Sequence, residues 1–284
     1  MAVQAAVDPR TRGTADAPAL VVRQLTKRYG GFEAVKGIDF HVGRQEIFGL
    51  LGPNGAGKTT TIEIIVGLRP ATSGSVEILG VDLARDPVRA RTLLGIQLQE
   101  SDFFEHLTLS EQLTFLGSCY GVRPDAAALL SYVDLGDRAG WKLKQLSGGQ
   151  KQRFAIAAAL VNDPPVVLLD EPSTGLDPAA RRQLWDLIRG LRDDGRTVLL
   201  STHYMEEAEV LCDRVAIMDR GRIAGIDTPL ALIQGLVATG FKREVVVRDA
   251  TLEDVFISLT GHGLDDDEPP PEVHDSRGRR ARGR

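Results

Sequence analysis

The chain has only two cysteines, Cys119 and Cys212, in 284 residues. They form no spaced cluster, which argues against a disulfide framework or a zinc site and fits a reducing cytoplasm. Long hydrophobic runs are also lacking, since the longest notable one is only Phe154–Val161 and a spanning helix needs roughly eighteen apolar residues. Residues 1–18 carry no long apolar core, so they do not resemble a secretory signal. We therefore expect a chain that does not cross a membrane by itself.

No strong excess of charge of one sign is present either. The net charge is −5, so the composition gives no indication of nucleic-acid binding. No internal repeat is found. With 43% hydrophobic residues, the chain is long enough for one large or two small domains with a sizeable core. The last stretch, residues 263–284, is poor in apolar residues and highly charged, and it is predicted to be disordered, as is the tail 1–18.

A glycine-rich loop follows the apolar run Ile47–Leu51 and opens a segment, residues 58–68, that is predicted to be a helix. It fits the phosphate-loop pattern G-x-x-x-x-G-K-[ST]. A strand before the loop and a helix after it are the context that this pattern requires. The residues of the loop are Gly52, Pro53, Asn54, Gly55, Ala56, Gly57, Lys58, Thr59 and Thr60.

The physical chemistry of this loop favours a nucleotide over a plain turn. Its glycines let successive backbone N–H groups surround an anion, and the following helix points its positive end at the same place. Lys58 would reach the β- and γ-phosphates, and the Thr59 hydroxyl would ligate Mg²⁺. With average glycine usage, an accidental match in a chain of this length is expected on the order of once in a hundred.

Strands and helices alternate along most of the chain, which predicts an α/β fold with a mainly parallel sheet. Two hairpin-like strands between Ile38 and Leu51 predict antiparallel pairing near the N-terminus. From about residue 101 the pattern becomes helical, with a capping box at Thr108–Glu111. One helical face there would form the insert's own core, made of Leu109, Leu113, Leu116 and Tyr120.

Polar side chains end two apolar strands in the second half of the chain. Val166–Pro172 reads as a buried parallel strand that ends in Asp170 and Glu171, and Thr197–His203 ends in a histidine. Ligands of parallel sheets bind outside the carboxyl ends of the strands. Two carboxylates there, beside a phosphate loop, indicate metal and water handling.

Two further positions have both a structural and a functional interpretation. Tyr29, beside the Gly30-Gly31 turn, packs at a strand end or stacks on a base, and packing is the simpler reading. The turn before a helix at residues 147–150 is a second anion site or a plain helix cap by Ser147, and the cap is the simpler reading. The residues of this turn are Ser147, Gly148, Gly149 and Gln150.

Taken together, the motifs resemble those of ATP-binding cassette (ABC) ATPase subunits over roughly residues 20–229. Leu146–Gln150 is identical to the signature sequence of that family, and the elements follow in the family's order. The resemblance implies a P-loop NTPase core with an inserted helical subdomain, and an active ATPase that uses ATP and Mg²⁺. By the same resemblance, five residues take family roles: Tyr29 stacks on adenine, Gln99 is the glutamine-loop residue, Asp177 contacts a second subunit, Glu171 activates water and His203 fixes the γ-phosphate.

The resemblance also implies how the subunits assemble. The Ser-Gly-Gly turn of one copy would close on the nucleotide bound to another, so a homodimer is expected on ATP binding. Thr59, Gln99 and Asp170 are the expected metal-site residues. The phrase Thr251–Gly261 resembles the end of ATPase subunits from type-2 exporters, a branch that includes antibiotic-resistance pumps. That branch usually has a longer appendage before this phrase.

These implications give a domain plan and two candidate functions. We expect an ATPase domain at 19–230 with a helical insert at about 100–160, and a short extension at 231–262. The first function is the energy subunit of an exporter of a drug, antibiotic or lipid-like substrate, at the cytoplasmic face of the membrane, with a separate permease and no nucleic acid. The alternative is a soluble ABC ATPase that acts on nucleic acid or ribosomes. Such proteins commonly have two cassettes or a long coiled-coil insertion, and neither is present here.

A docking site for the permease is expected between Gln99 and Leu107. Phe103 and Phe104 stand together there among polar residues. Adjacent positions of a helix do not face one core, so one ring would be exposed and available to a partner helix. The alternative is a loop in which both rings point inward.

Overall fold

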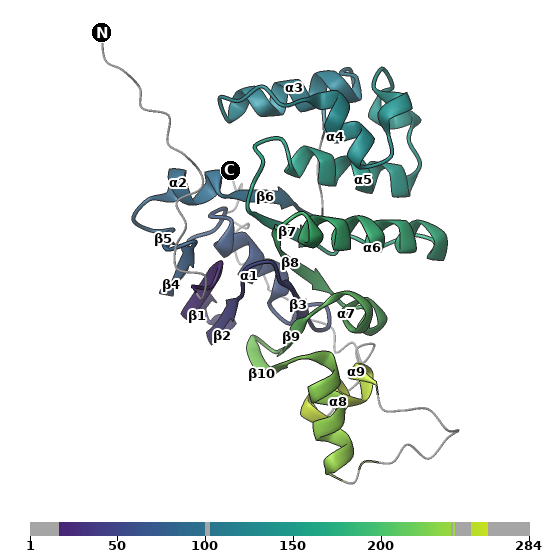
Figure 1. Cartoon of the computed structure of the whole chain (residues 1–284). Helices are drawn as coiled ribbons and strands as arrows, with labels where there is room; N and C mark the ends of the chain where they lie inside the picture. Colours follow the sequence, from purple (N-terminus) through teal and green to yellow (C-terminus); the bar gives the residue numbers. More distant parts are fainter. Residues whose placement is uncertain (1–16, 100–102, 240, 242–250, 261–284) are drawn as a thin grey trace, which may run out of the picture.

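The computed structural model describes residues 17–99, 103–239, 241 and 251–260. Within them two sheets and the surrounding helices form the predicted α/β fold, with antiparallel N-terminal strands, a mainly parallel sheet and an inserted helical subdomain (Figure 1). The predicted disorder at 1–18 and 263–284 concerns residues outside this description, apart from Ala17 and Pro18. No described helix is long and apolar enough to cross a bilayer.

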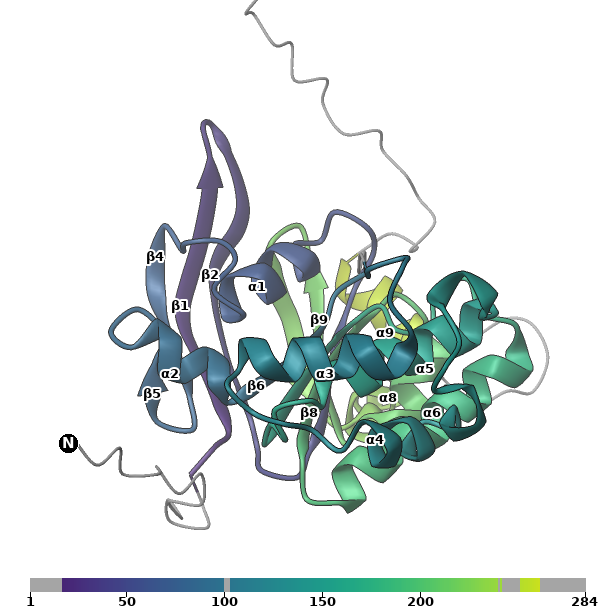
Figure 2. The ribbon, with the colours of Figure 1, turned by 90° about the horizontal axis from the view of Figure 1, so that it is seen from above.

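The first sheet is antiparallel and contains the N-terminal hairpin. Its strands are β1 (Leu20–Tyr29), β2 (Phe32–Val42), β4 (Ser73–Ile78) and β5 (Val81–Asp82). They lie in the order β2-β1-β4-β5. Strand β1 continues through Tyr29, which pairs with Phe32 across the Gly30-Gly31 turn. The hairpin therefore extends to Tyr29, and Figure 2 shows it projecting from the rest of the molecule.

The second sheet carries the phosphate loop and the polar strand ends. Its strands are β3 (Ile47–Leu51), β6 (Leu94–Gln97), β7 (Val166–Asp170), β8 (Thr197–Thr202), β9 (Arg214–Asp219) and β10 (Arg222–Asp227). The order is β10-β9-β3-β8-β7-β6, and every neighbouring pair is parallel except β9 and β10. Both faces are buried because alternate residues pack on opposite sides: in β7, Val166 and Leu168 on one and Val167 and Leu169 on the other.

Helices fill the space on both sides of this sheet. On the side that faces the first sheet lie two helices, α1 (Lys58–Ile65) and α2 (Pro87–Thr92). Helix α1 contributes Ile62, Ile64 and Ile65 to a core that contains residues of both sheets. The opposite face is covered mainly by three helices: α5 (Gly148–Ala159), α6 (Pro178–Asp193) and α7 (Met205–Leu211). Pro178 begins α6, where its missing N–H costs nothing, and Asp177 caps it.

The inserted subdomain has a core of its own. It is made of α3 (Leu109–Cys119), α4 (Ala126–Tyr132) and α5. The predicted capping box is present, because Thr108 Oγ1 accepts from Glu111 N and the Glu111 carboxylate accepts from Thr108 N at 2.8 Å. The predicted stripe is wrong at one end: Leu109 and Leu113 are buried, but Tyr120 is 41% exposed. The helix ends at Cys119, so Tyr120 leaves the helical face.

Two short helices end the described chain. These are α8 (Pro229–Ala238) and α9 (Leu252–Thr260), and α8 begins just before the predicted extension. Within the phrase at 251–261, residues Leu252–Thr260 form α9, and Leu252, Val255 and Phe256 are buried in a core that also contains residues of α7. This phrase is therefore part of the folded ATPase body, even though residues 242–250 are outside the description.

Candidate functional site

The site lies at the carboxyl ends of four neighbouring strands. In the sheet order, β3, β8, β7 and β6 lie next to one another and run parallel. Strand β3 leads into the phosphate loop, β8 into His203, and β7 ends at Asp170 with Glu171 following. Because these ends meet at one edge, residues more than a hundred positions apart come together.

Two glycines of the phosphate loop are required by close packing. A Cβ at Gly52 would lie 2.3 Å from the carbonyl oxygen of Met218 on the neighbouring strand β9. Gly57 has a φ of +103°, and a Cβ there would lie 2.7 Å from Ala34 O. Neither position accepts a side chain, so the loop must curve tightly before α1 begins.

Lys58 is buried and lies inside the loop that it terminates. Its Nζ donates to Gly52 O at 2.6 Å and Pro53 O at 3.0 Å, and it is 3.4 Å from Glu171 Oε1. Burial lowers the pKa of Lys58, and the charge of Glu171 partly opposes that shift. The loop thus holds a cation at the place where its sequence pattern predicts an anionic phosphate.

Asp170 and Glu171 have different surroundings although they are adjacent. Asp170 is 1% exposed and accepts a hydrogen bond from Ser201 Oγ, and burial raises its pKa. Glu171 has a φ of +48°, a left-handed backbone that non-glycine residues rarely adopt, and its N–H donates to Ser201 Oγ at 3.0 Å. Such a conformation persists where the surrounding structure fixes it, and it turns the Glu171 side chain away from the strand direction. Ser201 was not among the sequence candidates, because nothing in the pattern of strand β8 distinguishes this residue from its neighbours.

His203 and Glu171 are in contact at the edge of the sheet where their strands end. His203 Nδ1 lies 3.1 Å from Glu171 Oε2, and Thr174 Oγ1 donates to the same oxygen at 3.3 Å. The hydrogen bond with His203 comes first among the causes that lower the pKa of Glu171 to about 2, and Lys58 adds to it. The structure therefore brings Lys58, Asp170, Glu171 and His203 together, as their strand positions predict.

This pKa shift predicts how stability depends on pH. The pKa of Glu171 is about 2 in the folded chain against 4.5 ordinarily, so its ionised form favours folding above about pH 4.5. That contribution is lost as the pH falls from about 4.5 toward about 2. We expect the difference in unfolding free energy between the wild type and Glu171→Gln to decrease over this range. Urea unfolding from about pH 7 to about pH 3 measures it, and a constant difference would contradict the assigned contacts.

Tyr29 stands at the tip of the first sheet with cations on its ring. It is 39% exposed, and Lys27 Nζ and Arg69 Cζ lie 5.2 and 5.3 Å from its ring centroid. Glu63 holds Arg69 by two hydrogen bonds of 2.6 and 3.1 Å. The ring is thus partly exposed rather than packed in the core, which keeps it available for a flat ligand. Glu63 and Arg69 were not among the sequence candidates, because neither lies in a recognised motif.

The Ser147 turn is a helix cap in this chain. Ser147 and Gln150 form a reciprocal capping box at the start of α5. A Cβ at Gly149 would lie 2.9 Å from Ala180 Cβ on α6, whereas Gly148 has open space around it. No hydrogen bond or ion pair between described residues joins this turn to Lys58, Glu171 or His203. Within one copy, the turn and the phosphate-loop site are separate.

Asp177 and Gln99 also lie outside the cluster of direct contacts. The Asp177 carboxylate accepts from Ala179 N and Ala180 N, both at 2.9 Å, which lowers its pKa. Strand β6 ends at the buried Gln97. Gln99 follows as an exposed residue just past the strand end, beside the end of β7.

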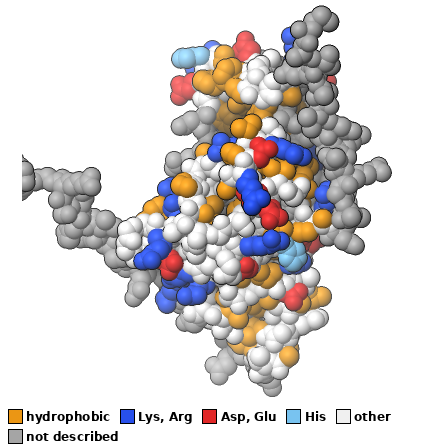
Figure 3. All heavy atoms as spheres, turned by 90° about the vertical axis from the view of Figure 1, so that its left-hand side faces the viewer, with side chains coloured by type: hydrophobic (Ala, Val, Ile, Leu, Met, Phe, Trp, Pro, Cys, Tyr) orange, Lys and Arg blue, Asp and Glu red, His pale blue; other side chains and the backbone are white. Residues whose placement is uncertain are grey.

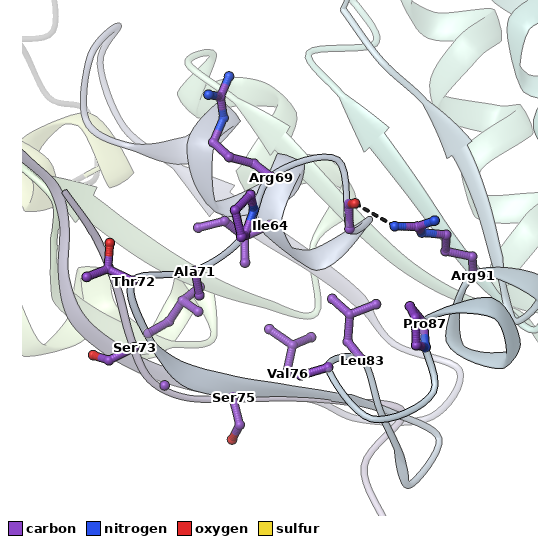
Figure 4. A pocket seen from close by; sticks show the side chains of 15 residues that line it. Ile64, Arg69, Ala71, Thr72, Ser73, Ser75, Val76, Leu83, Pro87 and Arg91 are labelled. Atoms are coloured by element: carbon purple, nitrogen blue, oxygen red, sulfur yellow. Dashed lines mark hydrogen bonds between the residues drawn. The ribbon is translucent and has the colours of Figure 1, made fainter. Parts of the chain in front are cut away.

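A separate cavity of about 450 Å³ lies between β4, α2 and the end of α1. Ile64, Val76 and Leu83 point into it, and Arg91 donates to Gly67 O at 2.7 Å across its border (Figure 4). None of the predicted site residues lines it. This cavity is therefore not the candidate nucleotide site.

Comparison with known proteins identifies the family. Residues 35–174 match the family model described as ABC transporter. The chain is 40% identical to the Nod factor export ATP-binding protein I of Ralstonia nicotianae, over 79% of this chain and 72% of that protein. This chain belongs to the ABC transporter ATPase family. It is also 41% identical to the linearmycin resistance ATP-binding protein LnrL of Bacillus subtilis, over 76% of this chain and 71% of that protein.

Solved structures of ABC ATPases have the same fold. A structure of an ATP-binding subunit of an ABC transporter has a TM-score of 0.73 at 31% identity, over 85% of this chain and 99% of that one. The structure of cbiO1 from Clostridium perfringens, part of the transporter complex cbiONQ, has a TM-score of 0.69 at 27% identity, over 78% of this chain and 95% of that one. The predicted family, fold and ATPase activity are confirmed: the chain is an ATP-binding, ATP-hydrolysing subunit of the kind that works with membrane permease components.

Proposed function

We propose that this ABC ATPase powers the export of a drug-like, antibiotic or lipid-like substrate through a separate permease, as a peripheral protein on the cytoplasmic face of the membrane. The observation that carries the proposal is the likeness to two groups of export and resistance ATP-binding proteins, together with a filled set of nucleotide-site residues. The named relatives export a Nod factor or confer linearmycin resistance, and neither name assigns the substrate of this chain.

In this proposal the phosphate loop binds the ATP phosphates and Tyr29 stacks on the adenine. Lys58 now donates to two loop carbonyls and neighbours Glu171. Phosphate oxygens would replace these partners, because a charge-assisted bond to phosphate is stronger than one to a carbonyl. Once Lys58 binds phosphate instead of Glu171, the Glu171 carboxylate would be a better proton acceptor. ATP binding would in this way prepare the residue that activates water.

Residues at two strand ends and at the start of α1 carry oxygen atoms that would suit a magnesium ion. Thr59 offers a hydroxyl oxygen, Asp170 a carboxylate and Gln99 an amide oxygen, and Mg²⁺ prefers such oxygen ligands together with phosphate. Asp170 is a buried carboxylate whose pKa is raised by burial, so a nearby cation would favour its ionised form. When bound, the ion would neutralise charge on the β- and γ-phosphates. Ser201 would keep Asp170 in place, and Glu171 and His203 would face the γ-phosphate.

Two copies would complete each nucleotide site. Ser147, Gly148, Gly149 and Gln150 begin α5 with N–H groups that can bind an anion, and Gly148 faces open space. No hydrogen bond or ion pair of the described residues joins this turn to the phosphate loop of the same copy, which supports a turn that would close on the nucleotide of a second copy. Asp177, exposed at the start of α6, would lie in that dimer interface.

A groove beside the glutamine loop is the proposed permease site. It measures about 590 Å³ and lies between the end of α1, β6, α3 and α5. Figure 3 views the molecule from the side of α2, and hydrophobic side chains gather at its upper end, where Figure 1 places α3. The expectation of one exposed phenylalanine is met: Phe104 is 54% exposed, whereas Phe103 lies edge-on to Phe154 at 5.1 Å and borders the groove.

We expect Leu68→Ser to weaken permease binding roughly 10- to 100-fold, the loss for one large apolar side chain that becomes buried on docking. Leu68 borders the groove and is 64% exposed, so the variant should fold and bind ATP normally. Leu230→Ser is a matched control, because Leu230 is 63% exposed and lies on α8, which Figure 1 shows at the opposite end of the molecule from α3. The measurement is co-purification of integral membrane proteins with the tagged chain from detergent-solubilised cells. Recovery of ribosomes or nucleic acid without a membrane protein would replace export by the soluble alternative.

A further inference from the structure

Tyr204 follows His203 and packs against it. Ring centroids of the two residues are 4.1 Å apart with an angle of 42° between the planes. Neighbouring side chains at the end of a strand normally point to opposite faces. Here the chain turns directly after β8, because Tyr204 N donates to Thr202 Oγ1 at 2.9 Å. The turn brings the two rings onto the same side.

Helix α6 contacts the Tyr204 ring through Arg181. Arg181 Cζ lies 5.0 Å from the Tyr204 ring centroid, within the range of a cation–π interaction. The Arg181 side chain is 22% exposed, and its Nη1 is 3.7 Å from Glu206 Oε2. Arg181 Nε is buried and has no hydrogen-bond partner among the described residues. The aromatic ring is therefore a main contact of this guanidinium.

A buried hydrogen bond joins α6 to α7. Trp185 Nε1 on α6 donates to Glu207 Oε1 on α7 at 2.9 Å, and Glu207 is fully buried. Arg181 and Trp185 lie one helical turn apart, as i and i+4, so both face α7. The segment 203–207 is thus attached to α6 at two points.

We propose that Tyr204 is a positioning residue for His203, and that Arg181 holds Tyr204 in place from α6. The contacts form one series: the Arg181 guanidinium on the Tyr204 ring, this ring on the His203 imidazole, and His203 Nδ1 at 3.1 Å from Glu171 Oε2. Loss of the Tyr204 ring would remove this packing from the imidazole and let it leave the orientation in which it meets Glu171. Since α6 begins at Asp177, the helix that would contact the second copy also fixes the histidine orientation.

This inference rests on the proposed role of His203 at the γ-phosphate. A small displacement of such a group costs up to about 10²-fold in rate. We expect Tyr204→Leu to lower kcat for ATP about 10- to 100-fold with KM changed less than about two-fold, and Tyr204→Phe to stay within about two-fold of wild type. Arg181→Gln should fall between them, since it removes the cation and keeps the ring.

The control is Tyr132→Leu. A Cβ added at Gly190 on α6 would lie 3.4 Å from the Tyr132 hydroxyl oxygen, so this variant loses a tyrosine contact with the same helix away from His203. It should keep wild-type kcat. If Tyr132→Leu lowers kcat as much as Tyr204→Leu does, the effect belongs to the stability of α6 and the positioning role is wrong.

A second measurement does not depend on hydrolysis. The chain has five histidines, and in a nitrogen-15 histidine NMR spectrum the His203 ring signals are assigned by their loss in His203→Gln. These signals should shift in Tyr204→Leu and stay in place in Tyr204→Phe and Tyr132→Leu. Unchanged signals in Tyr204→Leu would overturn the packing role. Shifted signals with unchanged kcat would uphold the contact and reject the positioning role, whereas unchanged kcat in His203→Gln would reject the role of His203 in the reaction, which separates the two failures.

Discussion

Replacing Glu171 by glutamine is expected to lower ATP hydrolysis roughly 10²- to 10⁴-fold, the usual contribution of a positioned general base. Glutamine keeps the shape and can still meet His203 Nδ1, which is 3.1 Å from Glu171 Oε2. It has no carboxylate to accept a proton from water. ATP binding should persist because the phosphate loop is untouched, so the variant should accumulate as an ATP-bound dimer.

Phosphate release measures the turnover of this variant, and size-exclusion chromatography with ATP and Mg²⁺ measures the dimer. Glu77→Gln is a suitable control, since Glu77 lies on β4 and pairs with Arg23 at 3.3 Å, outside the strand-end cluster. Wild-type turnover in Glu171→Gln would remove Glu171 from the reaction. A monomer that binds ATP normally would instead count against the proposed closure of two copies on the nucleotide.

Replacing Lys58 by alanine is expected to weaken ATP binding by about 100-fold or more. Several charge-assisted hydrogen bonds to the β- and γ-phosphates would be lost, and each contributes about 1.5–3 kcal/mol. The fold should survive, because burial lowers the pKa of Lys58 and its charge is costly where it lies. Its loss leaves the Glu171 carboxylate with its contacts to His203 and Thr174.

Titration calorimetry with ATP gives the affinity of this variant, and a thermal melt shows that it folds. Lys144→Ala, at an exposed lysine before the Ser147 turn, should bind ATP as the wild type does. Unchanged affinity in a folded Lys58→Ala variant would contradict the assignment of the loop to the phosphates.

Much of the site could be predicted from the sequence because its motifs depend on local geometry. Gly52 and Gly57 stand where no Cβ fits, so the loop pattern is a consequence of its packing. The apolar runs that end in Asp170 and His203 are the pattern of strands buried on both faces, and such strands meet their neighbours at one edge. The family, the fold and the ATPase activity followed from these stretches.

Only the tertiary structure decided which partners surround these residues. The contacts of Ser201 with Asp170, Arg181 with Tyr204 and Trp185 with Glu207 each join two different elements. Their distances depend on sheet order and helix packing, which no short pattern records. The ends of the elements depend on the same packing: β6 ends at Gln97 and α3 at Cys119, where strand pairing and helix hydrogen bonds stop, so Tyr120 lies outside the helix that its apolar spacing predicts.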